Sequence, residues 1–180
     1  MPIFARKKMI LQDDCFDVLS GFPSADVSLK YKGPEPQKVY QKTRELFWTV
    51  FQVKEGERVQ ERDYEWKRSG KREDFKVKWN IVKEMDRMSY LFFKVSLKGF
   101  AEETKNGKEG EFEMDMTGVI RTEYPQDNVW ERTIFYEMAR VFWSKVFYQD
   151  KRFKYQGICR SMLTTFRNEL KAFFNLLPKS

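Results

Sequence analysis

The sequence predicts a single α+β domain, in which a four-stranded antiparallel β-meander packs one apolar face against a long C-terminal helical region. Two turn signals support the meander: Ser-Gly-Lys-Arg at 69–72 and Asn-Gly at 106–107 each lie between alternating apolar and polar runs. This alternation places the apolar residues of all four runs on one side of the sheet. Helical periodicity from residue 130 onward supplies the apolar partner that such a sheet needs.

The N-terminal part is predicted to hold one strand and one helix. Residues 1–22 show no decisive period and stay open between helix and strand. Residues 25–31 alternate and stop at Gly33, as a strand does. Residues 36–53 carry apolar side chains at three- and four-residue steps, and the proline at 36 suits a first helical turn.

The meander strands are predicted at 59–68, 73–83, 88–103 and 110–122, and the turns set their registers. The first hairpin places Trp66 opposite Phe75 and Asp63 beside Lys78. A three-residue loop at 85–87 then places Trp79 opposite Phe93.

A two-residue loop in the last hairpin pairs Lys105 with Lys108 and sets Leu97 opposite Met116. The same register puts Lys98 beside Asp115 and groups the acidic residues Glu111 and Glu113 on the outer side. A hard-cation site is conceivable there. A solvated, charge-paired sheet face is favoured.

The C-terminal region is predicted to hold two helices. Residues from Trp130 to Val146 have helical period, a break follows near 150–157, and a second apolar stripe runs to Leu177, before Pro178.

Composition narrows the classes of function. The chain has 180 residues, 41% of them hydrophobic, and no low-complexity linker, which favours one domain over 1–180. It has no apolar run of the ~18 residues that a membrane span needs and no signal-peptide core, so we expect a cytoplasmic protein. Cys15 and Cys159 are expected to be free thiols. The absence of histidine removes the commonest general base and metal ligand, and no cofactor is predicted.

The order of strand, helix, meander and long final helix is similar to the helix-grip fold of the SRPBCC superfamily, which includes START, Bet v 1 and polyketide cyclase-like proteins. The segments 74–86 (DFKVKWNIVKEMD) and 168–173 (NELKAF) resemble uncharacterised archaeal members. The resemblance covers about residues 24–177. It implies a cavity between sheet and final helix for a hydrophobic or amphipathic small molecule.

The candidate ligand-binding residues are aromatic or methionine side chains on the faces that would line this cavity. Such residues make adaptable apolar pockets, and they also fill ordinary cores, so both interpretations stay open. The set comprises Trp66, Phe75, Trp79, Phe93, Met114 and Met116 on the sheet, with Phe142, Met162 and Phe166 opposite.

Two alternative functions compete with apolar binding. Residues 151–180 hold seven cations and one anion, a net charge of +6, with Phe153 and Tyr155 among them. This segment predicts binding to nucleic acid or to an anionic membrane surface, with Phe173 and Phe174 on the apolar side, unless it is a plain solvated helix face. A cyclase- or isomerase-like enzyme would use Tyr64 or Tyr90 as proton carriers. We expect a binding protein rather than an enzyme.

Overall fold

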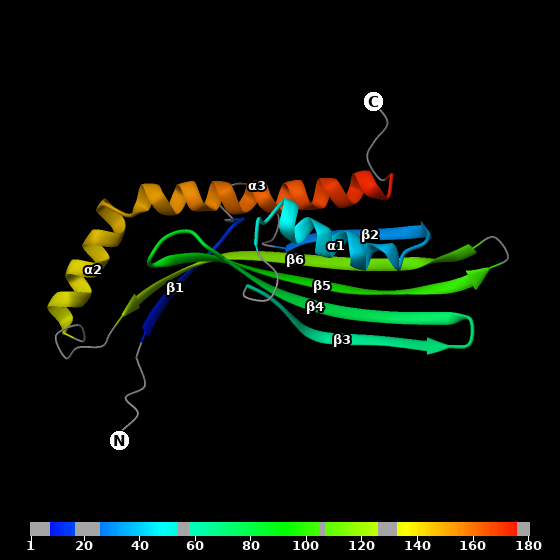
Figure 1. Cartoon of the computed structure of the whole chain (residues 1–180). Coiled ribbons are helices and arrows are strands. Elements are labelled where there is room, and N and C mark those ends of the chain that lie inside the picture. Colours follow the sequence, from blue (N-terminus) through cyan, green and yellow to red (C-terminus); the bar gives the residue numbers. More distant parts are fainter. Residues whose placement is uncertain (1–7, 17–25, 54–57, 105–106, 126–132, 176–180) are drawn as a thin grey trace, which may run out of the picture.

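A six-stranded antiparallel sheet carries two helices along one face, and a third helix lies beyond the end of the sheet (Figure 1). The computed structural model describes residues 8–16, 26–53, 58–104, 107–125 and 133–175. The elements in chain order are β1 (Lys8–Asp14), β2 (Asp26–Pro34), α1 (Lys38–Thr49), β3 (Val59–Ser69), β4 (Arg72–Glu84), β5 (Ser89–Thr104), β6 (Gly107–Pro125), α2 (Ile134–Val146) and α3 (Gln149–Phe173).

The predicted meander is confirmed, and two further strands extend it. The strand order is β1-β6-β5-β4-β3, and β2 also pairs with β6. The free edge of β6 is shared, because β2 pairs with its residues 109–117 and β1 with its residues 119–125. A strand at Lys8–Asp14 therefore answers the question that the sequence left open for residues 1–22, of which 1–7 and 17–22 lie outside the described residues.

The β3–β4 register is as predicted. Trp66 lies opposite Phe75, and the Lys78 Nζ donates to Asp63 Oδ2 at 2.7 Å. A register shift follows between Glu61 and Asp63, so the pairing changes toward the start of β3.

The other two predicted registers are wrong by two residues. Leu97 pairs with Met114 rather than Met116, and Trp79 with Val95 rather than Phe93. A slip of two leaves every side chain on its predicted face, because side chains alternate with period two. The apolar pattern therefore allows either register, and the turns decide between them.

Both turns differ from the loops that the sequence suggested. In the β4–β5 turn, Asp86 Oδ1 accepts backbone hydrogen bonds from Met88 (2.9 Å) and Ser89 (2.8 Å), which closes a longer loop. In the β5–β6 hairpin, Thr104 pairs with Gly107, while the tip at 105–106 lies outside the described residues. As a result Lys98 lies opposite Glu113, with its Nζ 2.8 Å from that carboxylate, and not beside Asp115.

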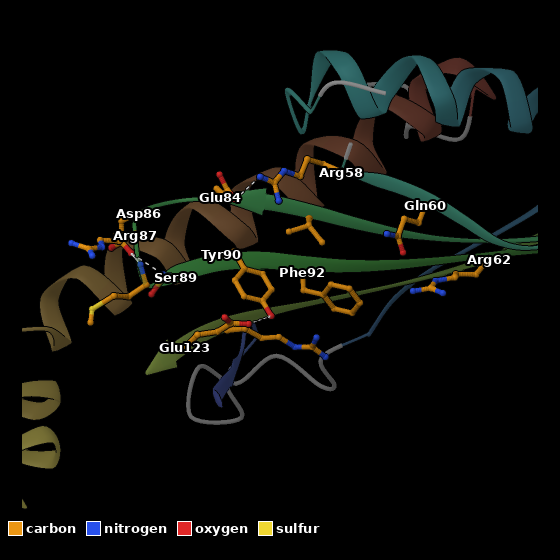
Figure 2. A pocket seen from close by; sticks show the side chains of 13 residues that line it. Arg58, Gln60, Arg62, Glu84, Asp86, Arg87, Ser89, Tyr90, Phe92 and Glu123 are labelled. Atoms are coloured by element: carbon orange, nitrogen blue, oxygen red, sulfur yellow. Dashed lines mark hydrogen bonds and ion pairs between the residues drawn. The ribbon is translucent and has the colours of Figure 1, made fainter. Parts of the chain in front are cut away.

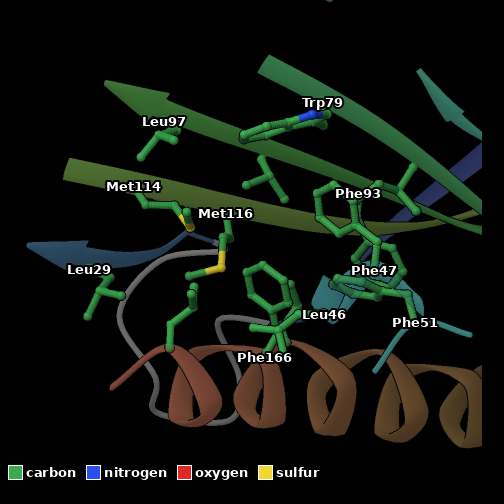
Figure 3. Close-up of a cluster of buried hydrophobic side chains, with 14 of the residues drawn as sticks. Leu29, Leu46, Phe47, Phe51, Trp79, Phe93, Leu97, Met114, Met116 and Phe166 are labelled. Atoms are coloured by element: carbon green, nitrogen blue, oxygen red, sulfur yellow. The ribbon is translucent and has the colours of Figure 1, made fainter. Parts of the chain in front are cut away.

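One core fills the space between the inner face of the sheet and the helices α1 and α3. Figure 3 shows Phe166 of α3 meeting Leu46, Phe47 and Phe51, with Trp79 and Phe93 on the sheet side. The helix α3 contributes side chains at steps of four, three and four residues, all fully buried, namely Cys159, Leu163, Phe166 and Leu170.

The helical predictions are confirmed with changed boundaries. The break between α2 and α3 falls at Phe147 and Tyr148 and not at 150–157, and α3 continues through Gly157, where an added Cβ would meet no atom within 4 Å. Trp130 and the segment 176–180 lie outside the described residues. In the described part of the chain, no helix is both long and apolar enough to cross a membrane.

Candidate functional site

Six of the nine predicted ligand-binding residues come together, and they do so inside the core. Phe75, Trp79, Phe93, Met114, Met116 and Phe166 are all buried in one hydrophobic cluster, and Trp66 and Met162 pack against its edge, half-buried. Their role in binding a ligand stays a prediction.

Helix α1 and the residues just after it occupy the space that the resemblance assigned to a ligand. The Phe51 ring centroid lies 4.5 Å from that of Phe93 and 5.2 Å from that of Phe166, and Phe47 lies 5.6 Å from Trp79. These are contact distances for aromatic pairs, so side chains fill this part of the interface. The described residues line hollows in other places, on α2 and on the outer face of the sheet.

Phe142 does not join the other eight residues. It lies on α2 with 61% of its surface exposed, so the expectation that it faces the sheet is wrong. The physical reason is that α2 extends past the end of the sheet (Figure 1).

The two predicted proton carriers lie apart from each other. Tyr64 is exposed on the edge strand β3, and its ring contacts Tyr40 and Trp66. Tyr90 belongs to the opposite face of the sheet, where its hydroxyl donates to Glu123 at 3.2 Å. Tyr64 and Tyr90 therefore do not belong to one site.

Helix α2 has the reverse of the usual distribution of side chains. Its buried charged residue is Arg140, 8% exposed, whose guanidinium lies 5.2 Å from the centre of the Tyr124 ring and also pairs with Glu137. Its large apolar side chains face solvent; they are Ile134, Phe135, Met138, Val141, Phe142, Trp143 and Val146, followed by Phe147 at the C-terminal cap. Exposed groups of large apolar side chains are typical of interaction surfaces.

A shallow apolar hollow of about 500 Å³ lies on this helix. Apolar side chains form most of its lining, and Glu137 and Lys145 are the two charged residues among the seven that line it. The apolar members are Ile134, Met138, Val141, Phe142 and Val146. The composition suits an apolar chain with a polar end.

The residues between α2 and α3, Phe147 and Tyr148, form a bend that we call the elbow, and it is anchored by hydrogen bonds. Asp86 Oδ2 accepts from the hydroxyls of Tyr148 (2.7 Å) and Tyr155 (2.8 Å), while Oδ1 accepts the two backbone bonds of the β4–β5 turn. The Tyr148 hydroxyl also lies 2.7 Å from Ser89 Oγ. The β4–β5 turn thereby holds the start of α3.

The acid–base properties of this cluster suit an anchor and not a proton carrier. Burial, and then the hydrogen bond to Asp86, raise the pKa of Tyr148, and the same two causes raise the pKa of Tyr155 to about 12. Burial opposes ionisation of Asp86, but hydrogen bonds from Tyr148, Met88, Tyr155 and Ser89 outweigh it and lower its pKa. Both tyrosines therefore stay protonated at neutral pH and Asp86 stays charged.

Two further links tie α3 to the N-terminal part of the chain. Cys15 and Cys159 form a disulfide, so the expectation of two free thiols is wrong. This pairing leaves no local pattern in the sequence, because 144 residues separate the two cysteines; the fold brings their Cα atoms to 5.8 Å. Nearby, Arg152 Nε donates to Asp13 Oδ2 at 2.9 Å.

The basic C-terminal segment is divided by this packing. Phe153, Lys151 and Lys154 are exposed, whereas Tyr155 turns inward to Asp86 and Arg152 pairs with Asp13. The two aromatic side chains of the predicted nucleic-acid surface therefore point to different environments. Phe174, predicted on an apolar side for a membrane, is buried against Tyr31 and Phe112.

Described residues on the outer face of the sheet line two hollows. One, of about 630 Å³, lies around Lys30, Lys98 and Glu113. Hydrogen bonds first from Lys30 and then from Lys98, both 2.8 Å away, lower the pKa of Glu113 to about 2. This charge pairing matches the solvated face that the sequence favoured, and no group of His, Cys, Asp or Glu within the described ranges is arranged to hold a metal ion.

The second hollow, of about 450 Å³, we call the outer groove; it lies between β3, β4, β5 and β6 next to the β4–β5 turn (Figure 2). Four guanidinium groups line it, from Arg58, Arg62, Arg87 and Arg121. Sequence reasoning missed this cluster because its members come from separate elements. The apolar surface of α2 did leave a signal, since apolar residues between 134 and 147 occupy more than one helical stripe.

Comparisons with known proteins leave the family open. No family model matches the chain, and no curated protein is significantly similar to it. A solved structure of the protein of unknown function SA2116 from Staphylococcus aureus aligns over 84% of this chain and 94% of its own, at 10% sequence identity and a TM-score of 0.24. At this score the similarity supports no argument about fold or function.

Proposed function

We propose that this chain is a non-catalytic binding protein that docks on an anionic lipid surface through α2. The observation that supports the proposal is the reversed helix, with Arg140 turned toward the protein and the large apolar side chains turned away from it. The elbow, at the junction of α2 with α3, is fixed by the hydrogen bond from Tyr148 to Asp86. An exposed apolar surface on a fixed helix is suited to binding a partner outside the chain.

The composition of the exposed surface favours a lipid occupant. Trp143 and several phenylalanines suit the boundary between head groups and acyl chains, and the exposed Lys145, Lys151 and Lys154 lie on or just after this helix. The chain as a whole carries a net charge of +7, which favours an anionic surface over a neutral one. Immersion also covers more than one stripe of the helix, whereas a partner helix covers a single stripe.

The energies are sufficient for reversible docking. Burying four large apolar side chains at about 1.5–3 kcal/mol each contributes about 6–12 kcal/mol. Each lysine near an anionic surface adds about 1 kcal/mol. A micromolar dissociation constant needs about 8 kcal/mol.

The ligand that the sequence analysis anticipated, a hydrophobic or amphipathic molecule, is in this proposal the lipid itself. The hollow on α2, lined by Met138, Val141 and Phe142 among others, is large enough for part of one acyl chain. The binding surface then lies on α2 and not between sheet and α3. Membership of the SRPBCC superfamily likewise stays a proposal, supported by the element order and by the position of α3 along the sheet.

Vesicle co-sedimentation tests the proposal with a matched pair of tryptophans. Trp143 on α2 and Trp48 on α1 are similarly exposed, 52% and 45%. We expect binding to phosphatidylcholine vesicles that contain phosphatidylglycerol, and a loss of about tenfold or more for Trp143→Ser, because one buried aromatic is worth about 1.5–3 kcal/mol. Trp48→Ser should bind like the unchanged protein.

Three results would contradict the proposal: no vesicle binding, equal losses for both variants, or a stable lipid-free dimer that Trp143→Ser dissociates. The dimer would assign α2 to a second copy of this chain, and sedimentation equilibrium without lipid measures it directly.

A further inference from the structure

The outer groove has the properties of a site for a small polar anion. Its volume of about 450 Å³ lies within the usual range of small-molecule sites. Val82 and Phe92 are half-buried in its lining, and Tyr90, Glu84 and Glu123 provide polar groups around it. Figure 2 shows Arg87 at one end of the groove and Arg62 at the other.

Two of the four arginines are held in place by neighbours. Arg58 pairs with Glu84 at the rim of the groove. The Arg121 guanidinium lies 4.2 Å from the centre of the Phe92 ring, and its Nε donates to Gln12 at 3.3 Å. These contacts orient planar donors before any ligand arrives, which lowers the entropic cost of binding.

The other two arginines, Arg62 and Arg87, have no acidic or hydrogen-bonding partner within the described part of the chain. Both are exposed, and both line the groove. A guanidinium without a carboxylate partner offers a fork of donors that matches the oxygens of a phosphate. The acceptors Gln60, Glu84 and Glu123 in the same lining suit hydroxyl groups.

We propose that the outer groove binds a hydroxyl-rich organic phosphate, with the phosphate at Arg87 and the hydroxyls toward Glu84. Two sources share this chemistry, a free sugar phosphate and the head group of a phosphorylated polyol lipid. The second source rests on the proposed function, because Arg87 follows Asp86, the residue that the α2–α3 elbow contacts through Tyr148. A lipid phosphate bound there would lie beside the helix that enters the lipid surface.

Calorimetric titration of the full chain with soluble probes tests the groove apart from any membrane. Glucose 6-phosphate should bind more tightly than inorganic phosphate, and glucose should show no measurable binding, because the phosphate supplies most of the interaction with arginine. Arg87→Ala should weaken glucose 6-phosphate binding by about tenfold, and Arg87→Lys should restore only part of it, because an ammonium lacks the planar fork.

Lys76 is the matched control, since it is an exposed cation on the same face of the sheet and does not line the groove. Lys76→Ala should leave binding unchanged. Equal weakening by Lys76→Ala and Arg87→Ala would show attraction to the overall positive charge and would overturn the site. Absence of saturable binding at physiological salt would overturn it as well.

Vesicles containing phosphatidylinositol or phosphatidylglycerol separate the two sources. A preference for phosphatidylinositol that Arg87→Ala removes supports a lipid head group. Equal binding to both lipids, together with binding of glucose 6-phosphate, supports the free sugar phosphate. Trp143→Ser should weaken vesicle binding by about tenfold or more and leave the titration with glucose 6-phosphate unchanged. Vesicle binding without any sugar phosphate binding would overturn the groove and leave the docking role of α2 intact.

Discussion

Helices α1 and α2 are nearly equal in length, 12 and 13 residues, yet they distribute their side chains in opposite ways. Helix α1 buries Val39, Leu46 and Phe47 and exposes most of its charged residues. Helix α2 buries Arg140 and exposes Phe135 and Ile134, each by 73%. The difference follows from position, because α1 packs against the sheet and α3 through Phe47, whereas α2 extends past the end of the sheet. Apolar content alone therefore did not determine which helix joined the core.

The largest expected effect comes from truncating a buried side chain of α1. Phe47→Ala should lower the free energy of unfolding by about 3–5 kcal/mol, the usual cost of removing a buried aromatic ring, because Phe47 packs on Trp79 and Phe166. Urea unfolding followed by circular dichroism measures the change. An unchanged unfolding midpoint would show that α1 is not part of the core and would remove the basis of the comparison.

The disulfide should come next in size. It closes a loop of 144 residues, and loss of such a link costs about 2–4 kcal/mol by restoring freedom to the unfolded chain. Reducing the native protein with dithiothreitol should lower the urea midpoint. The double variant Cys15→Ser/Cys159→Ser is the control, since its midpoint should not respond to the reductant. If reduction leaves the native protein equally stable, the disulfide does not contribute to the free energy of unfolding.

The elbow should have a smaller effect that depends on pH. Asp86→Asn should cost about 1–3 kcal/mol near neutral pH, because a half-buried acceptor of four hydrogen bonds loses its charge. The pKa of Asp86 is lowered in the folded state, so its contribution is present above the unfolded pKa of about 3.9 and is lost as the pH falls through the folded value.

Tyr148 and Tyr155 should make the free energy of unfolding depend on pH with the opposite sign, at alkaline pH. Their pKa values are raised, to about 12 for Tyr155, so their contribution is present below the unfolded pKa of about 10 and is lost as the pH rises through the folded value. Urea unfolding of the native chain and of Asp86→Asn at a series of pH values measures both the acidic and the alkaline loss of stability. Curves separated by a constant amount down to pH 2 would mean that Asp86 does not anchor the elbow as a carboxylate.

The smallest expected effect is on the exposed helix, and it completes the comparison. Phe142→Ala should change the free energy of unfolding by no more than about 0.5 kcal/mol, because the ring is mostly in solvent. Measured beside Phe47→Ala, it compares the same substitution at a buried and an exposed site. A loss of several kcal/mol for Phe142→Ala would mean that α2 packs against the chain in solution.

Period-two alternation was enough to predict the four-stranded meander and the faces of its strands, but not the pairing of β1 and β2 with β6. It could not set the register of β4–β5 or β5–β6, because Trp79 keeps its face whether it meets Phe93 or Val95. That choice depends on Asp86, whose side chain closes the turn with bonds that no apolar pattern reveals.

The candidate sites were harder to predict than the fold. Trp79 and Phe166 were correctly placed on inward faces, but the sequence does not show that Phe47 of α1, and Phe51 just after α1, fill the space between them. Phe142 carries the same helical period whether or not a sheet lies beneath it. The outer groove depends on arginines such as Arg62 and Arg121, which only the pairing of the strands brings to one place.

The disulfide also decides how the chain responds to cutting. Cys15 and Cys159 lie near opposite ends of the chain, so the bond between them turns residues 15–159 into a closed covalent ring that contains β2 to β6, α1 and α2. A protease that cuts this ring once opens it without releasing a fragment, and the product has the original mass plus one water. Only reduction then separates the two pieces. A protein with this topology can be nicked and still remain one molecule.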